Sequence, residues 1–173
     1  GLSVENSSRA GLLYHSIGVN GASFYHYNRS EYFLQQLPSL LPNLLIVSLG
    51  TNEALSSGFK ADKFREQVDA FLASIREKMP EIAILVTTNP DALKRGRYGK
   101  TTNPMAREVL IETAEKYGAA IWDLQTIMNV SGGVQKWRAE GLSGRDLIHF
   151  TRRGYELQGH LLYEALMNTY ELY

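Results

Sequence analysis

The stretch LLIVSLG, residues 44–50, decides the fold class of this chain. It is apolar up to its glycine apart from one serine, as expected for a strand that is buried on both faces of a parallel sheet. Similar apolar runs occur at residues 12–19, 82–86 and 119–122. Because these runs alternate with helical segments, we expect an α/β sandwich of three layers with a mostly parallel sheet.

Three helices are expected between and after these strands. The second begins with Asn103 as its N-cap and Pro104 in its first turn, and Gly118 ends it. The third runs from about residue 152 to 170, with Thr151 as its cap. The first is indicated by apolar residues at helical spacing, which form one stripe over about five turns: Phe64, Val68, Phe71, Leu72, Ile75 and Met79.

Composition excludes several classes of function. The 173 residues suit a single domain, and 18 Lys and Arg balance 18 Asp and Glu, which argues against a nucleic-acid partner. The absence of cysteine excludes a disulfide scaffold, a thiolate metal site and a cysteine nucleophile. No apolar run approaches the ~18 residues that a membrane span needs. Residues 1–6 lack the pattern of a signal peptide.

Two short segments place amide groups just after predicted strands. Gly21 lies in GVNGAS, residues 18–23, where a glycine lets the backbone turn tightly and bring an N–H close to a ligand. Asn52 follows the most buried strand and offers a side-chain amide. Each has a simpler explanation, Gly21 as a plain turn and Asn52 as a helix cap. Together they lie at the carboxyl ends of strands, where α/β folds bind ligands.

A third segment, DLIH at residues 146–149, precedes the last predicted helix. The three-residue spacing lets Asp146 accept from one imidazole nitrogen of His149 while the other nitrogen faces a substrate. A lone histidine near a helix start is more often structural. Combined with Gly21 and Asn52, however, the pair makes a set of two oxyanion donors and an oriented general base.

These segments are similar to the sequence blocks of a known family. GVNGAS (18–23), VSLGTNEA (47–54) and DLIHFTRRGY (146–155) resemble the second, third and fifth sequence blocks of the SGNH (GDSL-type) esterase/lipase superfamily. The resemblance implies a flavodoxin-like SGNH hydrolase fold that needs no cofactor. It implies that the Gly21 N–H and the Asn52 side chain bind the oxyanion, that His149 is the general base and that Asp146 orients it. It also favours export from the cell.

The resemblance extends from about Leu12 to Leu166. Residues 131–166 look like a bacterial subgroup that acts on O-acetylated carbohydrates or related cell-wall glycans. One departure is Glu53, which stands where the family usually has Asp. We expect little chemical consequence, because the donor is Asn52.

The second departure is the missing first block, an apolar strand that runs into Gly-Asp-Ser with the nucleophile. Ser23 and Ser143 are weak substitutes, and the earliest serines lie in a polar stretch that has the character of a linker: Ser3, Ser7 and Ser8. The hypothesis is therefore that residues 1–173 are the C-terminal part of one SGNH domain. The serine would lie upstream, ahead of an inserted domain of the kind that some family members carry, and the isolated chain would show little or no esterase activity.

Other functions remain open at this point. An acyltransferase would use the same groups, and a non-catalytic carbohydrate-binding domain would keep the fold without the nucleophile. A nucleotide-binding domain is disfavoured, because GVNG at residues 18–21 is neither a Walker loop nor a dinucleotide motif. The basic loop at residues 87–102 is either a solvated loop or part of a substrate site.

Metal binding and aromatic sugar stacking have weaker support. There is no HExxH motif, and three histidines lack carboxylates at ligand spacing, so we expect no metal: His15, His26 and His160. Three aromatic side chains are able to stack on a sugar, but packing is the favoured role for each: Tyr25, Tyr98 and Trp137.

Overall fold

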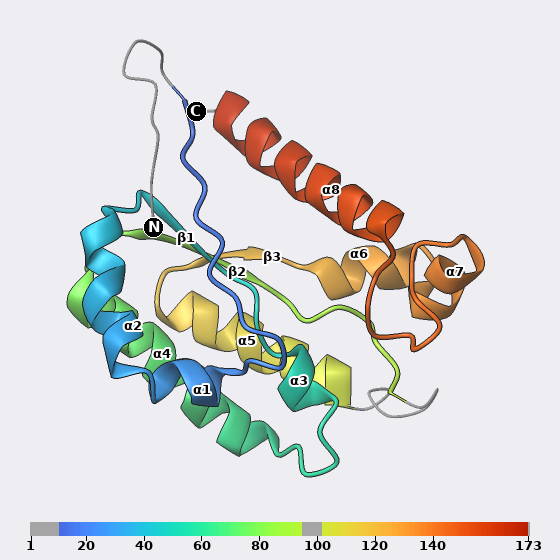
Figure 1. Ribbon diagram of the computed structural model, residues 1–173, viewed down its shortest axis with the longest axis horizontal. Coiled ribbons are helices and arrows are strands. Elements are labelled where there is room, and N and C mark those ends of the chain that lie inside the picture. Colours follow the sequence, from blue (N-terminus) through green and yellow to red (C-terminus); the bar gives the residue numbers. More distant parts are fainter. Residues whose placement is uncertain (1–10, 95–101, 173) are drawn as a thin grey trace.

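The computed structural model describes residues 11–94 and 102–172. Its centre is a three-stranded parallel sheet in the order β1-β2-β3, with helices on both faces (Figure 1). The strands are β1 (Leu44–Val47), β2 (Ala83–Thr87) and β3 (Ala120–Trp122). Leu45 pairs with Ile84, and Val86 with Ile121. The α/β class and the parallel sheet are therefore as expected.

The helices vary widely in length. The α4 and α8 ranges agree closely with the ranges predicted from periodicity and capping, and Thr151 caps α8 by accepting from the Gly154 N–H at 3.2 Å. The helical elements are α1 (Phe24–Asn28), α2 (Glu31–Gln36), the 3-10 helix η1 (Leu37–Leu40), α3 (Thr51–Ala54), α4 (Ala61–Lys78), α5 (Thr102–Lys116), α6 (Leu124–Val130), α7 (Gly133–Ala139) and α8 (Arg152–Glu171).

Alternation along the strands creates one apolar core on each face of the sheet. In β2, Ile84 and Val86 pack into the core beneath α1, α4 and α5, whereas Leu85 packs into the opposite core. Phe24 of α1 anchors the first core with ring centroids 5.8 Å from Phe64 and 5.5 Å from Phe71. The second core lies under α6, α7 and α8, and includes Leu85, Trp122, Leu124, Met128, Val134 and Trp137.

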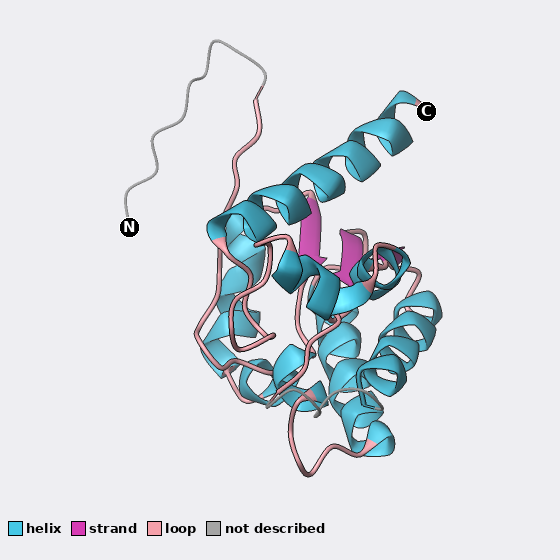
Figure 2. Cartoon of the chain, turned by 90° about the vertical axis from the view of Figure 1, so that its right-hand side faces the viewer, coloured by secondary structure: helices cyan, strands magenta, loops and turns pink. Residues whose placement is uncertain are grey.

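The strand expected at residues 12–19 does not form. These residues are an extended loop, with Leu12 and Val19 exposed by 88% and 74%. The reason is the absence of a partner. A strand is stable only when its N–H and C=O groups pair with a neighbour, and among the described residues nothing pairs with the β1 edge that faces away from β2. Figure 2 shows the loop passing to one side of the strands.

A smaller correction concerns the beginning of α5. Asn103 was expected to be the N-cap, but it lies inside the helix and is buried. Its side-chain N–H donates to the Ala92 carbonyl at 2.7 Å. The amide therefore ties α5 to the loop after β2 instead of capping the helix, because a buried polar group requires a partner wherever one lies within reach.

Helix α8 covers the second face of the sheet loosely (Figure 1). Gly154 is its only buried residue among those described, while Leu157, Leu161 and Leu162 pack partly against the core. Farther along α8, a cavity of about 440 Å³ separates the helix from β3, lined by apolar residues including Trp122. No described helix is long and apolar enough to cross a membrane.

Candidate active site

The turn before α8 joins Asp146 and His149 as the sequence predicted. Asp146 Oδ2 lies 2.7 Å from His149 Nδ1, while Oδ1 accepts from the backbone N–H groups of Ile148 and His149 at 3.0 Å each. The hydrogen bond from His149, supported by the Ile148 amide, lowers the pKa of Asp146 to about 2. Asp146 is therefore ionised at neutral pH and accepts the Nδ1 proton. This arrangement leaves Nε2 of His149 as the free, basic nitrogen.

The second pair of predicted residues also comes together. Gly21 has a left-handed backbone (φ +76°), and Asn52 lies at the beginning of α3, directly after β1 and Gly50. The Asn52 side-chain N–H donates to the carbonyl of Ala22 at 2.7 Å. Because an asparagine amide carries two N–H groups, one orients the side chain and the other remains for a ligand. The Gly21 turn and Asn52 are thus held as one unit.

Gly50 allows this approach of α3 to the core. Its backbone is left-handed (φ +112°), and a Cβ there would lie 3.3 Å from both Leu110 and Phe64. A side chain at this position would be strained and crowded. The glycine therefore lets the chain turn sharply from β1 into α3 and carry Asn52 to the end of the strand.

Glu53 faces the protein interior instead of the substrate side. Its Oε1 accepts from the backbone N–H of Phe24 at 2.7 Å, which ties α3 to α1. Burial raises the pKa of Glu53. The Glu53 side chain thus serves as an internal tie between the two helices. Sequence reasoning missed this contact, because Glu53 and Phe24 are far apart in the chain.

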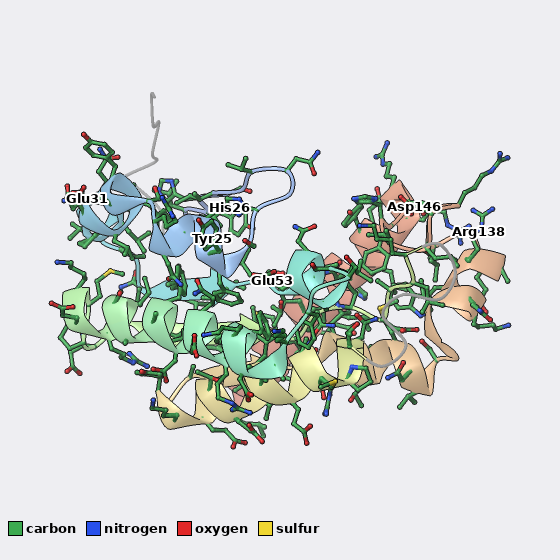
Figure 3. All side chains as sticks on the ribbon, turned by 90° about the horizontal axis from the view of Figure 1, so that it is seen from below. Tyr25, His26, Glu31, Glu53, Arg138 and Asp146 are labelled. Atoms are coloured by element: carbon green, nitrogen blue, oxygen red, sulfur yellow. The ribbon has the colours of Figure 1, made fainter. Side chains whose placement is uncertain are left out.

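Both pairs belong to the carboxyl end of the sheet. Asn52 follows β1, and the turn that carries Asp146 is hydrogen-bonded to the loop after β2, since the Leu93 N–H donates to the Leu147 carbonyl at 2.8 Å. In Figure 3, Glu53 on α3 lies between His26 on α1 and Asp146 on the turn before α8. Within residues 11–94 and 102–172, no hydrogen bond joins the two pairs directly.

The weaker serine candidates are buried. Ser143 is 1% exposed, with its hydroxyl 3.4 Å from the His149 carbonyl, and Ser23 is 8% exposed, with its hydroxyl 2.7 Å from Nδ1 of His26. Neither contacts the His149 imidazole, so neither is placed to lose its proton to that base. Ser3, Ser7 and Ser8 lie outside the described residues.

The aromatic side chains considered for sugar stacking differ in their exposure. Trp137 is 2% exposed in the second core, which confirms its packing role, whereas Tyr25 is 49% exposed on α1. Tyr98 and the rest of residues 95–101 in the basic loop lie outside the described residues. The described part of the chain contains no cluster of three side chains suited to hold a metal.

A parallel α/β sandwich that carries a carboxylate-oriented histidine and a paired Gly–Asn turn is compatible with the geometry of a serine-type ester hydrolase. A sequence profile of the GDSL-like lipase/acylhydrolase family matches residues 4–157. The chain therefore belongs to this family. None of the curated proteins compared with the chain matches it significantly.

Solved structures of esterases share the fold. A peptidoglycan O-acetylesterase matches with a TM-score of 0.81 and 21% identity over 89% of this chain, which spans 45% of that protein. A lipase/acylhydrolase from Enterococcus faecalis matches with a TM-score of 0.63 and 23% identity over 86% of this chain and 72% of that one. An acetyl xylan esterase matches with a TM-score of 0.67 and 19% identity, over 86% and 78%.

Proposed function

We propose that this chain is the C-terminal part of one SGNH domain in a longer serine esterase that removes acyl groups, chiefly acetyl, from a carbohydrate. The observation that carries the proposal is the 2.7 Å contact from Asp146 to Nδ1 of His149, which leaves Nε2 free in an exposed side chain. The acetyl and glycan specificity is supported by the names of similar structures, a peptidoglycan O-acetylesterase and an acetyl xylan esterase. A cell-wall ester as substrate implies export.

In the proposed mechanism, a serine upstream of this chain attacks the ester carbonyl carbon while Nε2 of His149 takes the hydroxyl proton. Asp146 stabilises the imidazolium. The Gly21 N–H and the free Asn52 N–H donate to the oxyanion of the tetrahedral intermediate. His149 then protonates the departing sugar oxygen as the C–O bond breaks. A water molecule attacks the acyl-serine in the same way, and acetate and the free serine result.

The sheet supports an upstream location for the serine. The outer edge of β1 is unpaired in the described structure, and residues 12–19 run extended and exposed without joining the sheet. Strands of a parallel sheet are normally buried on both faces, yet Leu44 is 40% exposed. We propose that the strand bearing the serine pairs with this edge and lies between β1 and residues 12–19.

The test compares the 173-residue chain with a longer natural polypeptide that includes the upstream segment, using p-nitrophenyl acetate and an O-acetylated glycan. We expect esterase activity in the longer protein alone. His149→Ala should reduce kcat by at least about 10³-fold and Asn52→Ala by about 10²–10³-fold. The matched control is His160→Ala, another exposed histidine, which pairs with Glu164 at 3.1 Å and should leave activity unchanged.

Four outcomes would contradict the proposal. Strong esterase activity of the 173-residue chain that is blocked by phenylmethanesulfonyl fluoride would place the nucleophile within it. Activity of the longer protein that survives His149→Ala would remove the proposed base. Glycan binding that is unaffected by His149→Ala, with no hydrolysis by the longer protein, would favour a non-catalytic carbohydrate-binding domain. Transfer of the acyl group to a sugar hydroxyl in place of water would identify an acyltransferase.

A further inference from the structure

The centre of the DLIH turn has an unusual backbone. Leu147 has a φ of +58°, and Leu41 is the only other non-glycine residue with a positive φ among those described. A branched side chain is disfavoured in this left-handed region, where glycine and asparagine are far more common. Such a conformation persists only when surrounding contacts impose it. Here the outlier lies between the two members of the proposed catalytic pair.

The left-handed residue occupies the position where the chain wraps around the Asp146 carboxylate. The N–H groups of the next two residues, Ile148 and His149, both donate to Oδ1, and the His149 imidazole meets Oδ2. One carboxylate thus receives three N–H groups from the two residues that follow Leu147. The carboxylate is thereby aimed at Nδ1 by the backbone as well as by the imidazole.

Contacts on the inner side of the turn maintain this backbone. The Leu147 side chain packs against the second core, while Asp146 and His149 remain exposed by 47% and 66%. The Leu147 carbonyl accepts from the Leu93 N–H at 2.8 Å, and the Leu147 N–H donates to the Gly144 carbonyl at 3.2 Å. The Gly144 N–H in turn donates to the His149 carbonyl at 2.7 Å, which closes the turn.

We propose that Leu147 is a positioning residue whose left-handed backbone, anchored to the second core and to Leu93, holds Asp146 in line with Nδ1 of His149. The catalytic meaning of this role rests on the proposed function, but the geometry does not. Leu93 follows β2, so the same hydrogen bond ties the orientation of the pair to the sheet.

The test compares Leu147→Val with Leu147→Asn in the 173-residue chain. Both variants weaken the apolar contact with the second core, valine by shortening the side chain and asparagine by making it polar, but valine resists a positive φ and asparagine accepts it. The readouts are the pKa of Asp146, from its carboxyl ¹³C shift, and the protonated nitrogen of His149, from its imidazole ¹⁵N shifts. We expect Leu147→Asn to keep the Asp146 pKa near about 2, and Leu147→Val to raise it toward 3.8 with loss of the Nδ1–H tautomer.

Leu161→Val is the matched control, because Leu161 packs on the same core from a regular helix. It should lower the Tm without changing either readout. If Leu147→Val does not fold, Leu147→Ala replaces it, since alanine is also disfavoured at positive φ. An unchanged Asp146 pKa in the valine or alanine variant, or an equal rise in the asparagine variant, would overturn the proposal. Neither readout requires an ester substrate, so failure here leaves the esterase proposal standing.

Discussion

Three carboxylates show how burial and hydrogen bonding shift the pKa of single residues in opposite directions. Asp146 lies on the surface, and the N–H groups around it lower its pKa to about 2. Asp123 is partly buried, which alone raises its pKa, but hydrogen bonds from Arg107, Thr126 and Thr88 overcome burial and lower it to about 2. For Glu53 the balance reverses, and burial raises the pKa despite the hydrogen bond from Phe24.

Glu53→Gln should make the protein more stable than the parent at pH 7. Glutamine keeps an oxygen for the Phe24 N–H and removes a buried charge. Because the folded pKa of Glu53 is raised, its favourable contribution is present below its unfolded pKa of 4.5 and is lost as the pH rises through the folded value. Urea unfolding at pH 7 and pH 4 should therefore show a gain at pH 7 that shrinks at pH 4.

The control for this prediction is Glu53→Ala, which leaves the buried Phe24 N–H without its acceptor. It should lower the free energy of unfolding by about 1–3 kcal/mol at both pH values. A loss of similar size in Glu53→Gln at pH 7 would show that the charge itself, and not only the acceptor, stabilises the α1–α3 contact.

Asp123→Asn should weaken the acid sensitivity of the fold. The lowered pKa of Asp123 contributes stability that is present above 3.8 and lost as the pH falls toward about 2. We expect the parent to lose on the order of 1–2 kcal/mol from this group over that range. The slope of unfolding free energy against pH should flatten in Asp123→Asn and stay unchanged in a Glu77→Gln control, which alters an exposed carboxylate on α4. An equal slope in parent and Asp123→Asn would contradict the assignment.

At the scale of elements, α8 is attached mainly through its first turn. Thr151 caps the helix, and Gly154 is packed so closely that a Cβ there would lie 2.0 Å from the Leu142 carbonyl oxygen. The rest of the helix makes only partial contact with the second core. Since His149 lies two residues before Thr151, the docking of this turn also determines where the proposed base is placed.

Gly154→Ala should destabilise the protein by about 1–3 kcal/mol, because the added methyl displaces the turn from the Leu142 carbonyl. Gly159→Ala, in the same helix with nothing within 4 Å of the added Cβ, should instead stabilise it by about 0.5–1 kcal/mol through helix propensity. Urea unfolding followed by circular dichroism measures both. Similar effects of the two substitutions would show that α8 is not anchored at Gly154.

At the scale of the whole molecule, the described sheet is open along β1. Its apolar residues Leu44 and Ile46 are not fully buried. Residues 12–19, which precede β1 in the chain, also expose apolar side chains to solvent. Unpaired strand edges of this kind favour pairing with another chain segment. The proposed upstream strand would provide backbone hydrogen-bond partners for both β1 and residues 12–19.

Hydrogen exchange should detect this pairing. In the longer polypeptide, the amides of residues 12–19 and of β1 should exchange at least about 10-fold more slowly than in the 173-residue chain, because they gain hydrogen-bonded partners. The amides of α4, which is already packed in the first core, should change little and serve as an internal reference. Equal exchange at residues 12–19 in both proteins would exclude the proposed strand position.

Local patterns in the sequence were sufficient for much of this molecule. The apolar run at 44–49 predicted β1, helical spacing predicted α4, Thr151 predicted the start of α8, and the spacing of Asp146 and His149 predicted their contact. In each case the interacting groups lie within a few residues of one another, so the local sequence carries the information.

Only the tertiary structure decided the rest, because the deciding partners are distant in the chain. Residues 12–19 have strand-like composition but no strand to pair with in the described part of the chain. The Asn103 side chain bonds to the Ala92 carbonyl instead of capping α5. Asn52 meets the Gly21 turn, and Leu147 takes a left-handed backbone, through contacts that no local pattern encodes. The propensities of single segments thus set the elements, while hydrogen-bond partners and packing across the fold set the geometry of the site.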